Sequence, residues 1–563
     1  MSNYLKKVFN ISNKIRIGII NTFFWIIIIF LIYLLSTSSE EVNWGETLYL
    51  QINGAVQESG TEDDLITLVT SENFEVPKNT LLRDLLGAIE QATADDSIKN
   101  MVIDLDSLDY IGLASNQEVG EALDKFKNSN KEIYVYSSFF DRDSYYLASF
   151  ASSISMDPFG EVNIDGISVY RSYLKNAIDK YDVDVTIFRA GDYKSYVEPY
   201  MSDSMSKGVK EQNLLWMNSI WDNYISQISK NRGFNSLLVD SYFSNRLDLT
   251  KKYSGDLSAL ALNEGFVDTL ESRNQFFDRF PSLVYYKDYI DKSKNDGATK
   301  VAVITLEGPI TYSDNSPGSI SAVDTEQLLD SVLDSDIEGV ILRINSGGGG
   351  VYASEIIRRK VEEVNRSIPV VISMGDVCAS GGYWIATAGS KIYADHSTIT
   401  GSIGVFGLIY GVEKTLENNF GIKTDGVSTT PNLEPVSLTK SISRDRADII
   451  QLNINDTYSK FKNLVAKSRG IDINSLESIA SGRVWSGAQA VGNGLVDSIG
   501  GLGEAKQFFG NDVQLIYKEG DIPLFDEVLK TFTSYSKVEI KVLEEFSIFE
   551  RINDPKNIYA LWL

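Results

Sequence analysis

The chain has 563 residues, of which 43% are hydrophobic, and a formal net charge of −25. This length is too great for one hydrophobic core and predicts more than one domain, while the apolar content excludes wholesale disorder. The acidic balance argues against a nucleic-acid partner, which would need a basic surface to neutralise its phosphates. The single cysteine, Cys378, and the single histidine, His396, exclude an intramolecular disulfide, a thiolate metal cluster and any site with two histidine ligands. We expect neither a metal nor a cofactor.

The N-terminus carries a membrane signal. Residues 17–35 are almost uninterrupted apolar sequence, and about 20 helical residues span a bilayer core of about 30 Å. Lysines and arginines precede this run, so the positive-inside rule puts residues 1–16 in the cytoplasm and the body across the membrane. A cleaved signal peptide is the alternative, but residues 36–39 (Ser-Thr-Ser-Ser) form a poor cleavage site. We therefore expect one uncleaved transmembrane anchor at residues 17–36.

The rest of the chain contains an internal duplication, in which residues 334–344 repeat the sequence pattern of residues 95–105. In the first copy, the patterns predict a strand, helix, strand, helix and strand at residues 48–54, 81–92, 101–105, 117–127 and 132–136. The second copy repeats that series at residues 303–308, 325–333, 340–344, 353–364 and 369–373. Strands that alternate with helices at this spacing predict α/β domains with parallel strands joined by right-handed crossovers.

The duplication also sets the expected domain boundaries. Residues 45–285 form the first repeat and residues 298–517 the second. A polar stretch at residues 286–297 is the expected linker. Residues 518–563 are not repeated, and we expect this tail to pack against the second domain.

The two copies have kept different chemical groups. A glycine-rich loop at residues 346–350 and the segment 379–382 (Ala-Ser-Gly-Gly) occur only in the second copy, where the first has residues 107–109 and 141–143. The first copy alone carries Lys194, in a tyrosine-rich segment. A serine in one copy and a lysine in the other predict a shared Ser/Lys active site.

Ser380 is the candidate nucleophile. It lies between a predicted strand and a predicted helix, where unpaired N–H groups at the start of a helix can bind an oxyanion. The alternative is an ordinary serine that caps a helix. The glycine run at residues 345–350 also joins a strand to a helix, which is no place for a flexible linker, and it lacks the spacing of a phosphate loop. That leaves a loop offering backbone N–H groups to a developing oxyanion.

A nucleophilic serine needs a base, and the candidates are His396, a carboxylate or Lys194. His396 lies in a short polar turn, where a lone histidine is more often a surface residue. A lysine serves as a base near neutral pH only if burial lowers its pKa. The aromatic and apolar neighbours of Lys194 could supply that burial, and an ordinary surface lysine is the alternative.

Taken together, these segments closely resemble the long, duplicated form of the bacterial signal peptide peptidase A family of membrane-bound serine peptidases. The N-terminal anchor contributes to the resemblance. The matching segments are residues 193–195, 197–199, the strand that leads into 345–346, and residues 353–358, 379–385, 400–407 and 484–496. Several separated motifs occur in the right order over most of the chain, so the resemblance is specific.

The resemblance implies a role for each matching residue. Ser380 corresponds to the nucleophile, Lys194 to the general base, and Ser402 to a hydroxyl that orients the lysine amine. The backbone N–H groups of Gly348 and Gly381 correspond to the oxyanion hole. The implied fold is two tandem domains of the crotonase-like α/β type shared with the Clp protease.

The resemblance also implies substrates and surroundings. Substrates would be cleaved signal peptides and other short unfolded apolar peptides, and the body would lie on the periplasmic side of the inner membrane. The family forms bowl-shaped homo-oligomers, with a tetramer favoured, and we expect oligomerisation to complete the seam between the copies. Whether Lys194 meets Ser380 within one chain or across two chains stays open.

Two departures from the family pattern stand out. Gly347 replaces a proline that is usual in the glycine loop, and His396 stands where a proline is common, so the histidine is not expected in the machinery. Two other functions are alternatives: an acyl-CoA enzyme of the crotonase type, which needs no nucleophile, and a catalytically impaired scaffold. The anchor and the acidity speak against the first, and the presence of both Ser380 and Lys194 speaks against the second.

Overall fold

The computed structural model describes residues 45–60, 79–235, 239, 242–290, 298–313, 318–430, 434–519 and 559–561. The expected cytoplasmic segment at residues 1–16 and anchor at residues 17–36 lie outside the described residues, as does most of the C-terminal tail. Within the described ranges, none of the helices combines the length and apolarity needed to cross a bilayer. The described residues from Thr47 onward form one compact unit.

The first copy is built on a parallel sheet. Its six strands lie in the order β10 (Leu283–Tyr285), β1 (Thr47–Gln51), β4 (Asn100–Asp104), β6 (Glu132–Ser137), β7 (Ser153–Met156) and β9 (Thr269–Leu270). The main crossover helices are α3 (Leu82–Ala94), α4 (Leu113–Asn128) and α5 (Arg142–Ser149). The apolar side chains of α3 recur at intervals of three and four residues, and this face is the buried one.

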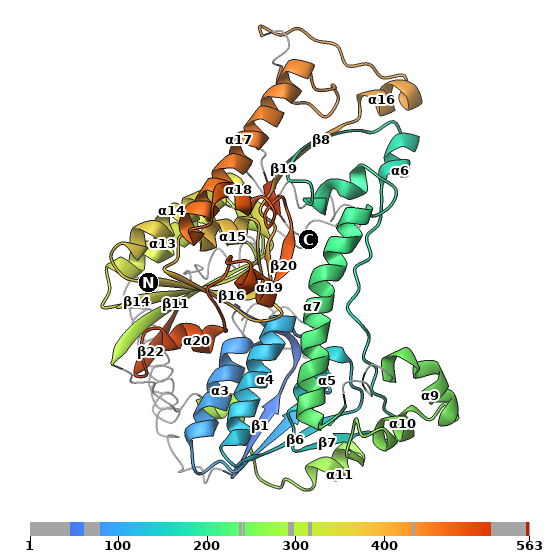
Figure 1. The fold of residues 1–563 in the computed structure, drawn as a ribbon, viewed down its shortest axis with the longest axis vertical. Helices are drawn as coiled ribbons and strands as arrows, with labels where there is room; N and C mark the ends of the chain where they lie inside the picture. Colours follow the sequence, from blue (N-terminus) through green and yellow to red (C-terminus); the bar gives the residue numbers. More distant parts are fainter. Residues whose placement is uncertain are drawn as a thin grey trace, which may run out of the picture. The chain divides into compact units, whose positions relative to one another are not determined.

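The second copy repeats this arrangement in six strands of an eight-stranded sheet, whose other two strands are β18 (Ile399–Gly401) and β20 (Val484–Ser486). Its parallel strands lie in the order β22 (Val513–Lys518), β11 (Thr299–Glu307), β14 (Gly339–Ser346), β16 (Val370–Ala379), β17 (Lys391–Ala394) and β21 (Ser498–Ile499). The corresponding helices are α13 (Ala322–Leu333), α14 (Val351–Asn365) and α15 (Gly381–Ala386). The equal strand order confirms the duplication and the mixed α/β fold, and Figure 1 shows the two sheets with their helices.

Shorter elements complete both copies. In the first they are β2 (Gly54–Gln57), β3 (Thr80–Leu81), β5 (Leu108–Tyr110), α6 (Lys175–Lys180), the 3-10 helix η1 (Ser195–Tyr200), α9 (Arg246–Lys252), α10 (Leu257–Asn263) and α11 (Arg273–Phe277). In the second they are β12 (Ile310–Thr311), β13 (Ile320–Ser321), α16 (Glu413–Phe420), α18 (Ile473–Leu476), β20 (Val484–Ser486), α19 (Gly487–Gly492) and α20 (Leu502–Gln507). Each copy also has one 26-residue helix, α7 (Lys207–Arg232) and α17 (Arg444–Arg469).

The start of the expected linker is helical instead. Residues 286–290 form α12 (Tyr286–Ile290), in which Tyr286 and Tyr289 are buried. The hydroxyl of Tyr289 donates to Asp95 Oδ2 over 2.8 Å, at the C-terminal end of α3. These five residues of the expected linker therefore pack on the first copy, because two aromatic rings three positions apart lie on one face of a helix. Residues 291–297 lie outside the described residues.

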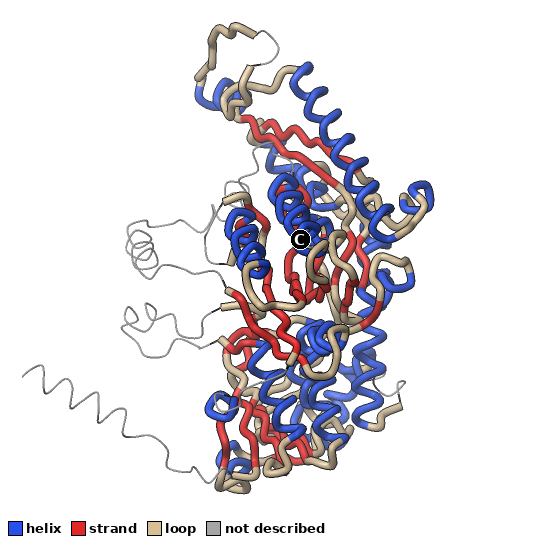
Figure 2. The backbone as a smooth tube through the Cα atoms, turned by 90° about the vertical axis from the view of Figure 1, so that its left-hand side faces the viewer, coloured by secondary structure: helices blue, strands red, loops and turns tan. Residues whose placement is uncertain are grey.

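The two copies share a third sheet. Strand β8 (Asp184–Ala190) belongs to the first copy and pairs antiparallel with β19 (Val405–Gly411) of the second over seven residue pairs. The sheet continues through β23 (Tyr559–Leu561) and β15 (Gly348–Gly350) to β12 and β13. In the upper part of Figure 2, the paired strands, in red, run beside the long helix α17, in blue. This pairing carries the chain that follows β8 into the second copy.

Buried charges also join the copies. The guanidinium of Arg343, on β14, contacts Oε1 of Glu58 over 2.9 Å and Oε1 of Glu118 over 2.5 Å, both from the first copy. All three side chains are buried. Asp376, on β16, accepts hydrogen bonds from the backbone and hydroxyl of Ser115 at the start of α4. A charge that is buried in this way is stable only when it is paired, so these contacts fix how the copies pack.

Candidate active site

Ser380 lies at a sharp turn between β16 and α15. Its φ is 56°, in the left-handed region, and its side chain is fully buried. The side chain makes no capping hydrogen bond to the helix, so it is not the ordinary N-cap that the sequence left open. A non-glycine residue held in this conformation costs on the order of 1 to 3 kcal/mol. The turn aims the hydroxyl away from its own helix.

Lys194 meets that hydroxyl. It lies in the loop between β8 and η1, and its side chain is 1% exposed. Its Nζ lies 2.5 Å from Ser380 Oγ, 3.0 Å from Ser402 Oγ and 3.1 Å from the carbonyl oxygen of Ser402. Burial lowers the pKa of Lys194 well below its usual value. Both groups belong to the same chain, which answers the question that the sequence left open.

Ser402 is buried like Lys194, and backbone hydrogen bonds fix its position. It lies between β18 (Ile399–Gly401) and β19, with a φ of 52° and 1% of its side chain exposed. Its backbone N–H donates to the carbonyl of Arg483 over 2.6 Å, and the carbonyl of Gly401 accepts from Ser380 N over 2.8 Å. The segment 401–402 thus contacts Ser380 through its backbone and Lys194 through Ser402.

The glycine loop lies against the start of α15. A Cβ on Gly381 would lie 2.7 Å from Ser354 Oγ and 3.1 Å from the Cα of Gly348, so only glycine fits there. Gly348 has a φ of 106°. Its N–H, an expected oxyanion donor, donates to Ser346 Oγ over 3.1 Å in this structure. Ser346 Oγ in turn donates to the carbonyl of Gly308 over 2.6 Å. The two expected donors therefore lie side by side, and one of them is already hydrogen-bonded.

His396 takes no part in these contacts. Within the described residues, no hydrogen bond joins it to Ser380 or Lys194. Its carbonyl accepts from Ala488 N over 3.3 Å, and burial lowers the pKa of its imidazole. The position agrees with the expectation that the histidine lies outside the machinery.

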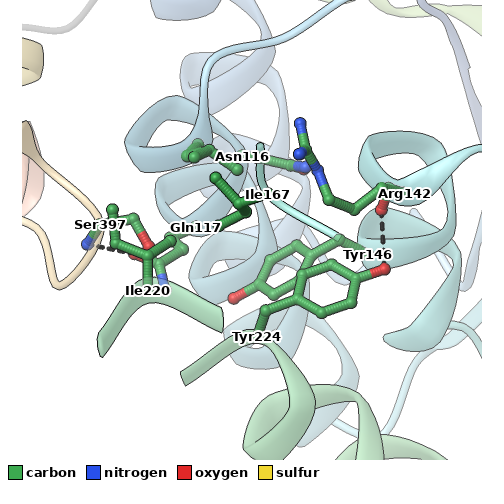
Figure 3. Close-up of a pocket in the computed structure, with 9 residues that line it drawn as sticks. Asn116, Gln117, Arg142, Tyr146, Ile167, Ile220, Tyr224 and Ser397 are labelled. Carbon is green, nitrogen blue, oxygen red and sulfur yellow. Dashed lines mark hydrogen bonds between the residues drawn. The ribbon is translucent and has the colours of Figure 1, made fainter. Parts of the chain in front are cut away.

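A small pocket lies beside α5 of the first copy and is also lined by Ser397 of the second copy (Figure 3). There α5 follows Asp141, as α15 follows Ser380, but the Asp141 side chain caps its own helix. The Arg142 guanidinium is paired with Asp143. The backbone carbonyl of Arg142 accepts a hydrogen bond from the hydroxyl of Tyr224, as Figure 3 shows. The lining residues are Leu113, Asn116, Gln117, Arg142, Tyr146, Ile167, Ile220, Tyr224 and Ser397. Position 141 carries a carboxylate instead of a hydroxyl, so α5 of the first copy has no counterpart of Ser380 at its start.

Two features of the site were not visible in the sequence. The strand β23, close to the C-terminus, lies between β15 and β19, with Gly349 paired to Ala560 and Phe406 to Tyr559. The turn at residues 481–483 contacts the lysine loop. The only sequence signal for the turn is that it directly precedes the segment 484–496, which carried part of the family resemblance.

Comparison with known proteins identifies the family. Residues 125–284 and 362–515 match Peptidase family S49, one match in each copy, and together they cover more than half of the chain. Protease 4 of Salmonella typhi is 33% identical over 529 residues, which cover 90% of this chain and 85% of that protein. The chain belongs to peptidase family S49. It is therefore a serine peptidase, and the resemblance to signal peptide peptidase A is confirmed.

This S49 peptidase is also similar to a second bacterial protease and, weakly, to a solved structure. Protease 4 of Haemophilus influenzae is 30% identical over 616 residues and covers 100% of this chain and 99% of its own. A solved ClpP1 mutant from Listeria monocytogenes is 17% identical, with a TM-score of 0.25, and covers 36% of this chain and 93% of its own. The Clp-like and crotonase-like description of each copy stays a prediction.

Proposed function

We propose that this S49 peptidase is a membrane-anchored endopeptidase in which Ser380 is the nucleophile and Lys194 the general base. The proposal rests above all on one observation, the 2.5 Å separation of Lys194 Nζ and Ser380 Oγ in a buried site. A neutral amine at that distance can accept the hydroxyl proton as the oxygen attacks a peptide carbonyl. Burial favours the neutral amine, because a charged ammonium there would lose its hydration.

Ser402 orients the amine in this mechanism. A neutral amine has two N–H bonds and one lone pair, and Ser402 offers two acceptors, its hydroxyl and its carbonyl, at 3.0 and 3.1 Å. When both N–H bonds are directed to Ser402, the lone pair faces Ser380. The proton taken from Ser380 is then available to the leaving amine of the substrate.

The oxyanion hole is formed by backbone N–H groups at the start of α15 and in β15. The N–H of Gly381 is one of the unpaired groups that begin a helix. The N–H of Gly348 is the second donor, and substrate binding replaces its hydrogen bond to Ser346 with one to the substrate oxygen. The exchange is local, because Ser346 keeps its hydrogen bond to Gly308.

Substrates are short, unfolded, apolar peptides, with cleaved signal peptides as the main class. The position of β23 supports this proposal, since it places a strand of main chain between β15 and β19, beside α15. A peptide bound there gains main-chain hydrogen bonds from strand addition, and a folded protein cannot present such a strand. The site accordingly selects extended segments.

The body lies on the periplasmic side of the inner membrane, anchored by the apolar run at residues 17–36. The protein forms a homo-oligomer, with a tetramer favoured by the family resemblance. Because Lys194 and Ser380 meet within one chain, oligomerisation encloses the site and does not assemble its two reactive groups.

The decisive experiment compares purified full-length variants on a fluorogenic peptide with an apolar signal-peptide segment. Ser380→Ala and Lys194→Ala each lower kcat/KM by roughly a thousandfold or more, whereas His396→Ala keeps most of its activity. Circular dichroism checks that each variant is folded. A folded but inactive His396→Ala variant, or an active Lys194→Ala variant, would overturn the assignment of the base.

The membrane proposal has its own test. The full-length protein stays in the membrane fraction after a high-salt wash, and protease added from the periplasmic side degrades the body. A mature protein that starts near Ser38 and is released as a soluble species would show a cleaved signal instead. That result would leave the catalytic assignment untouched.

A further inference from the structure

The turn at residues 481–483 (Ser-Gly-Arg), which we call the lysine clasp, has an unusual backbone. Ser481 and Gly482 are consecutive left-handed residues, with φ values of 56° and 81°. Ser481 is buried, and its N–H donates to the hydroxyl of Tyr458, on α17, over 3.0 Å. A strained pair of this kind persists only where its surroundings hold it, and such strain is concentrated at functional sites.

The clasp holds the two residues that precede Lys194. The N–H of Tyr193 donates to the carbonyl of Ser481 over 2.8 Å, and the N–H of Asp192 donates to Ser481 Oγ over 3.0 Å. Gly482 packs directly on the lysine backbone, where a Cβ would lie 2.4 Å from Lys194 N. The main chain that carries the base therefore has little room to move away from the clasp.

The same turn holds the residue that contacts the lysine amine. The carbonyl of Arg483 accepts from Ser402 N over 2.6 Å, and Gly482 N donates to the carbonyl of Ile403 over 2.8 Å. Three consecutive residues thus fix the segments on both sides of the Lys194 side chain. Neither segment is close to the clasp in sequence.

The Arg483 side chain continues the contact. Its guanidinium carbon lies 3.5 Å from the ring centroid of Tyr193, and its Nη1 donates to Gln212 Oε1 over 2.9 Å. Gln212 Nε2 donates to the carbonyl of Val484 over 2.5 Å, which ties α7 to the strand that follows the clasp. Stacking on an aromatic face makes the tyrosine a second attachment for the lysine loop.

We propose that residues 481–483 position the general base, by fixing the Lys194 backbone and Ser402 so that the amine faces Ser380. Ser481, Gly482 and Arg483 are positioning residues, since none of them makes a hydrogen bond to Ser380 or to the lysine amine among the described contacts. The inference rests on the proposed Ser/Lys chemistry and adds three residues to it. A displacement of about 1 Å at such a site lowers the rate by about 100-fold.

The charged groups around the lysine loop determine how the pH dependence of kcat/KM reflects the ionisation of the Lys194 amine. Asp192 and Glu198 lie on the lysine's own segment, and Arg171 donates to the carbonyl of Ser195 over 3.2 Å. On the clasp side lie Arg483 and Glu477, which contacts Ser481, while β18, β19 and α15 contain no charged residue. The hydrogen-bond partners of the amine are uncharged hydroxyl and carbonyl oxygens. Burial therefore governs the ionisation of the amine, and a displaced amine that gains solvent will hold its proton to higher pH.

The test measures kcat/KM against pH for full-length variants. Gly482→Ala forces the lysine backbone to shift, and Gly421→Ala is its matched control, because Gly421 is also left-handed, with a φ of 67°, but a Cβ there meets nothing within 4 Å. Gly482→Ala should lose about 100-fold in kcat/KM, and its acidic limb should move to higher pH. Gly421→Ala should keep the wild-type profile.

A second pair of variants serves if Gly482→Ala does not fold. Ser481→Ala removes the acceptor for Asp192 N, together with the hydroxyl's contact to Glu477, and should lower kcat/KM about tenfold with the same shift of the limb. Ser481→Asn should restore both, because asparagine tolerates the left-handed region and offers an acceptor. The inference is overturned if Ser481→Ala, or a folded Gly482→Ala, keeps the wild-type limb and rate. An active Lys194→Ala variant would instead overturn the proposed function.

Discussion

Lys194 and Ser380 are separated by 186 positions in the sequence, yet the amine and the hydroxyl lie 2.5 Å apart within one chain. The contact exists because β8, in the first copy, pairs along its whole length with β19 of the second, and Lys194 follows shortly after β8. The duplicated architecture thus places a lysine of the first copy beside a serine of the second.

This within-chain contact predicts that inactive variants do not rescue each other. When Ser380→Ala and Lys194→Ala proteins are mixed, or expressed together and purified as mixed oligomers, peptide hydrolysis should stay at the level of each variant alone. Differently tagged copies, captured in sequence, confirm that mixed oligomers have formed. Recovery of a quarter or more of the wild-type rate would show that the lysine reaches a serine of another chain.

Lys194→Met should abolish activity and stabilise the protein at neutral pH. Between the lowered pKa of the folded protein and the ordinary lysine pKa near 10.4, the unfolded chain binds one more proton, so wild-type stability rises with pH across that window. Methionine removes this penalty, which is about 1.4 kcal/mol for each pH unit by which the pKa is lowered.

Urea unfolding of the full-length protein in detergent, at several pH values between 7 and 10, measures this effect. The difference in unfolding free energy between Lys194→Met and wild type should shrink as the pH rises. The reason is that the unfolded wild-type chain then also loses the lysine proton, and burying a neutral amine no longer costs stability. A difference in unfolding free energy that stays constant with pH would show that burial does not hold the amine neutral.

Arg343→Met should destabilise the junction between the copies. It leaves the buried carboxylates of Glu58 and Glu118 without their partner, and breaking a buried ion pair in this way typically costs about 3 to 5 kcal/mol. The matched control is Arg359→Met, whose exposed pair with Glu355 contributes about 1 kcal/mol or less. Thermal unfolding compares the two, and equal losses would contradict the structural role of the buried cluster.

Removal of residues 559–563 should raise the initial rate on short peptides. The strand β23 lies between β15 and β19, where the proposed substrate binds, so the chain competes with its own substrate. The higher rate should appear as a lower KM with an unchanged kcat, because the deletion removes no contact of Ser380 or Lys194. Progress curves measured for both forms at equal concentration test this, and an unchanged or higher KM would argue that β23 does not occlude the site.

Several parts of this protein could be predicted from the sequence. The strand and helix patterns of the two copies gave the α/β fold and the duplication, because apolar periodicity is a local property. For example, the helix expected at residues 81–92 is α3 (Leu82–Ala94). The complementary loss of chemical groups also pointed to Ser380 and Lys194. The absence of the serine from the first copy and of the lysine from the second can be read directly from the sequence, although the distance between the two residues cannot.

The tertiary structure alone decided the rest. That the lysine and the serine meet in one chain depends on the register of β8 against β19, which no local pattern encodes. The hold of residues 481–483 on the lysine loop depends on backbone hydrogen bonds, and these carry no side-chain signature. The low pKa of Lys194 depends on burial by segments from both copies. Residue types can be read along a chain, but the distances and the burial that give them their chemistry arise only when distant segments pack together.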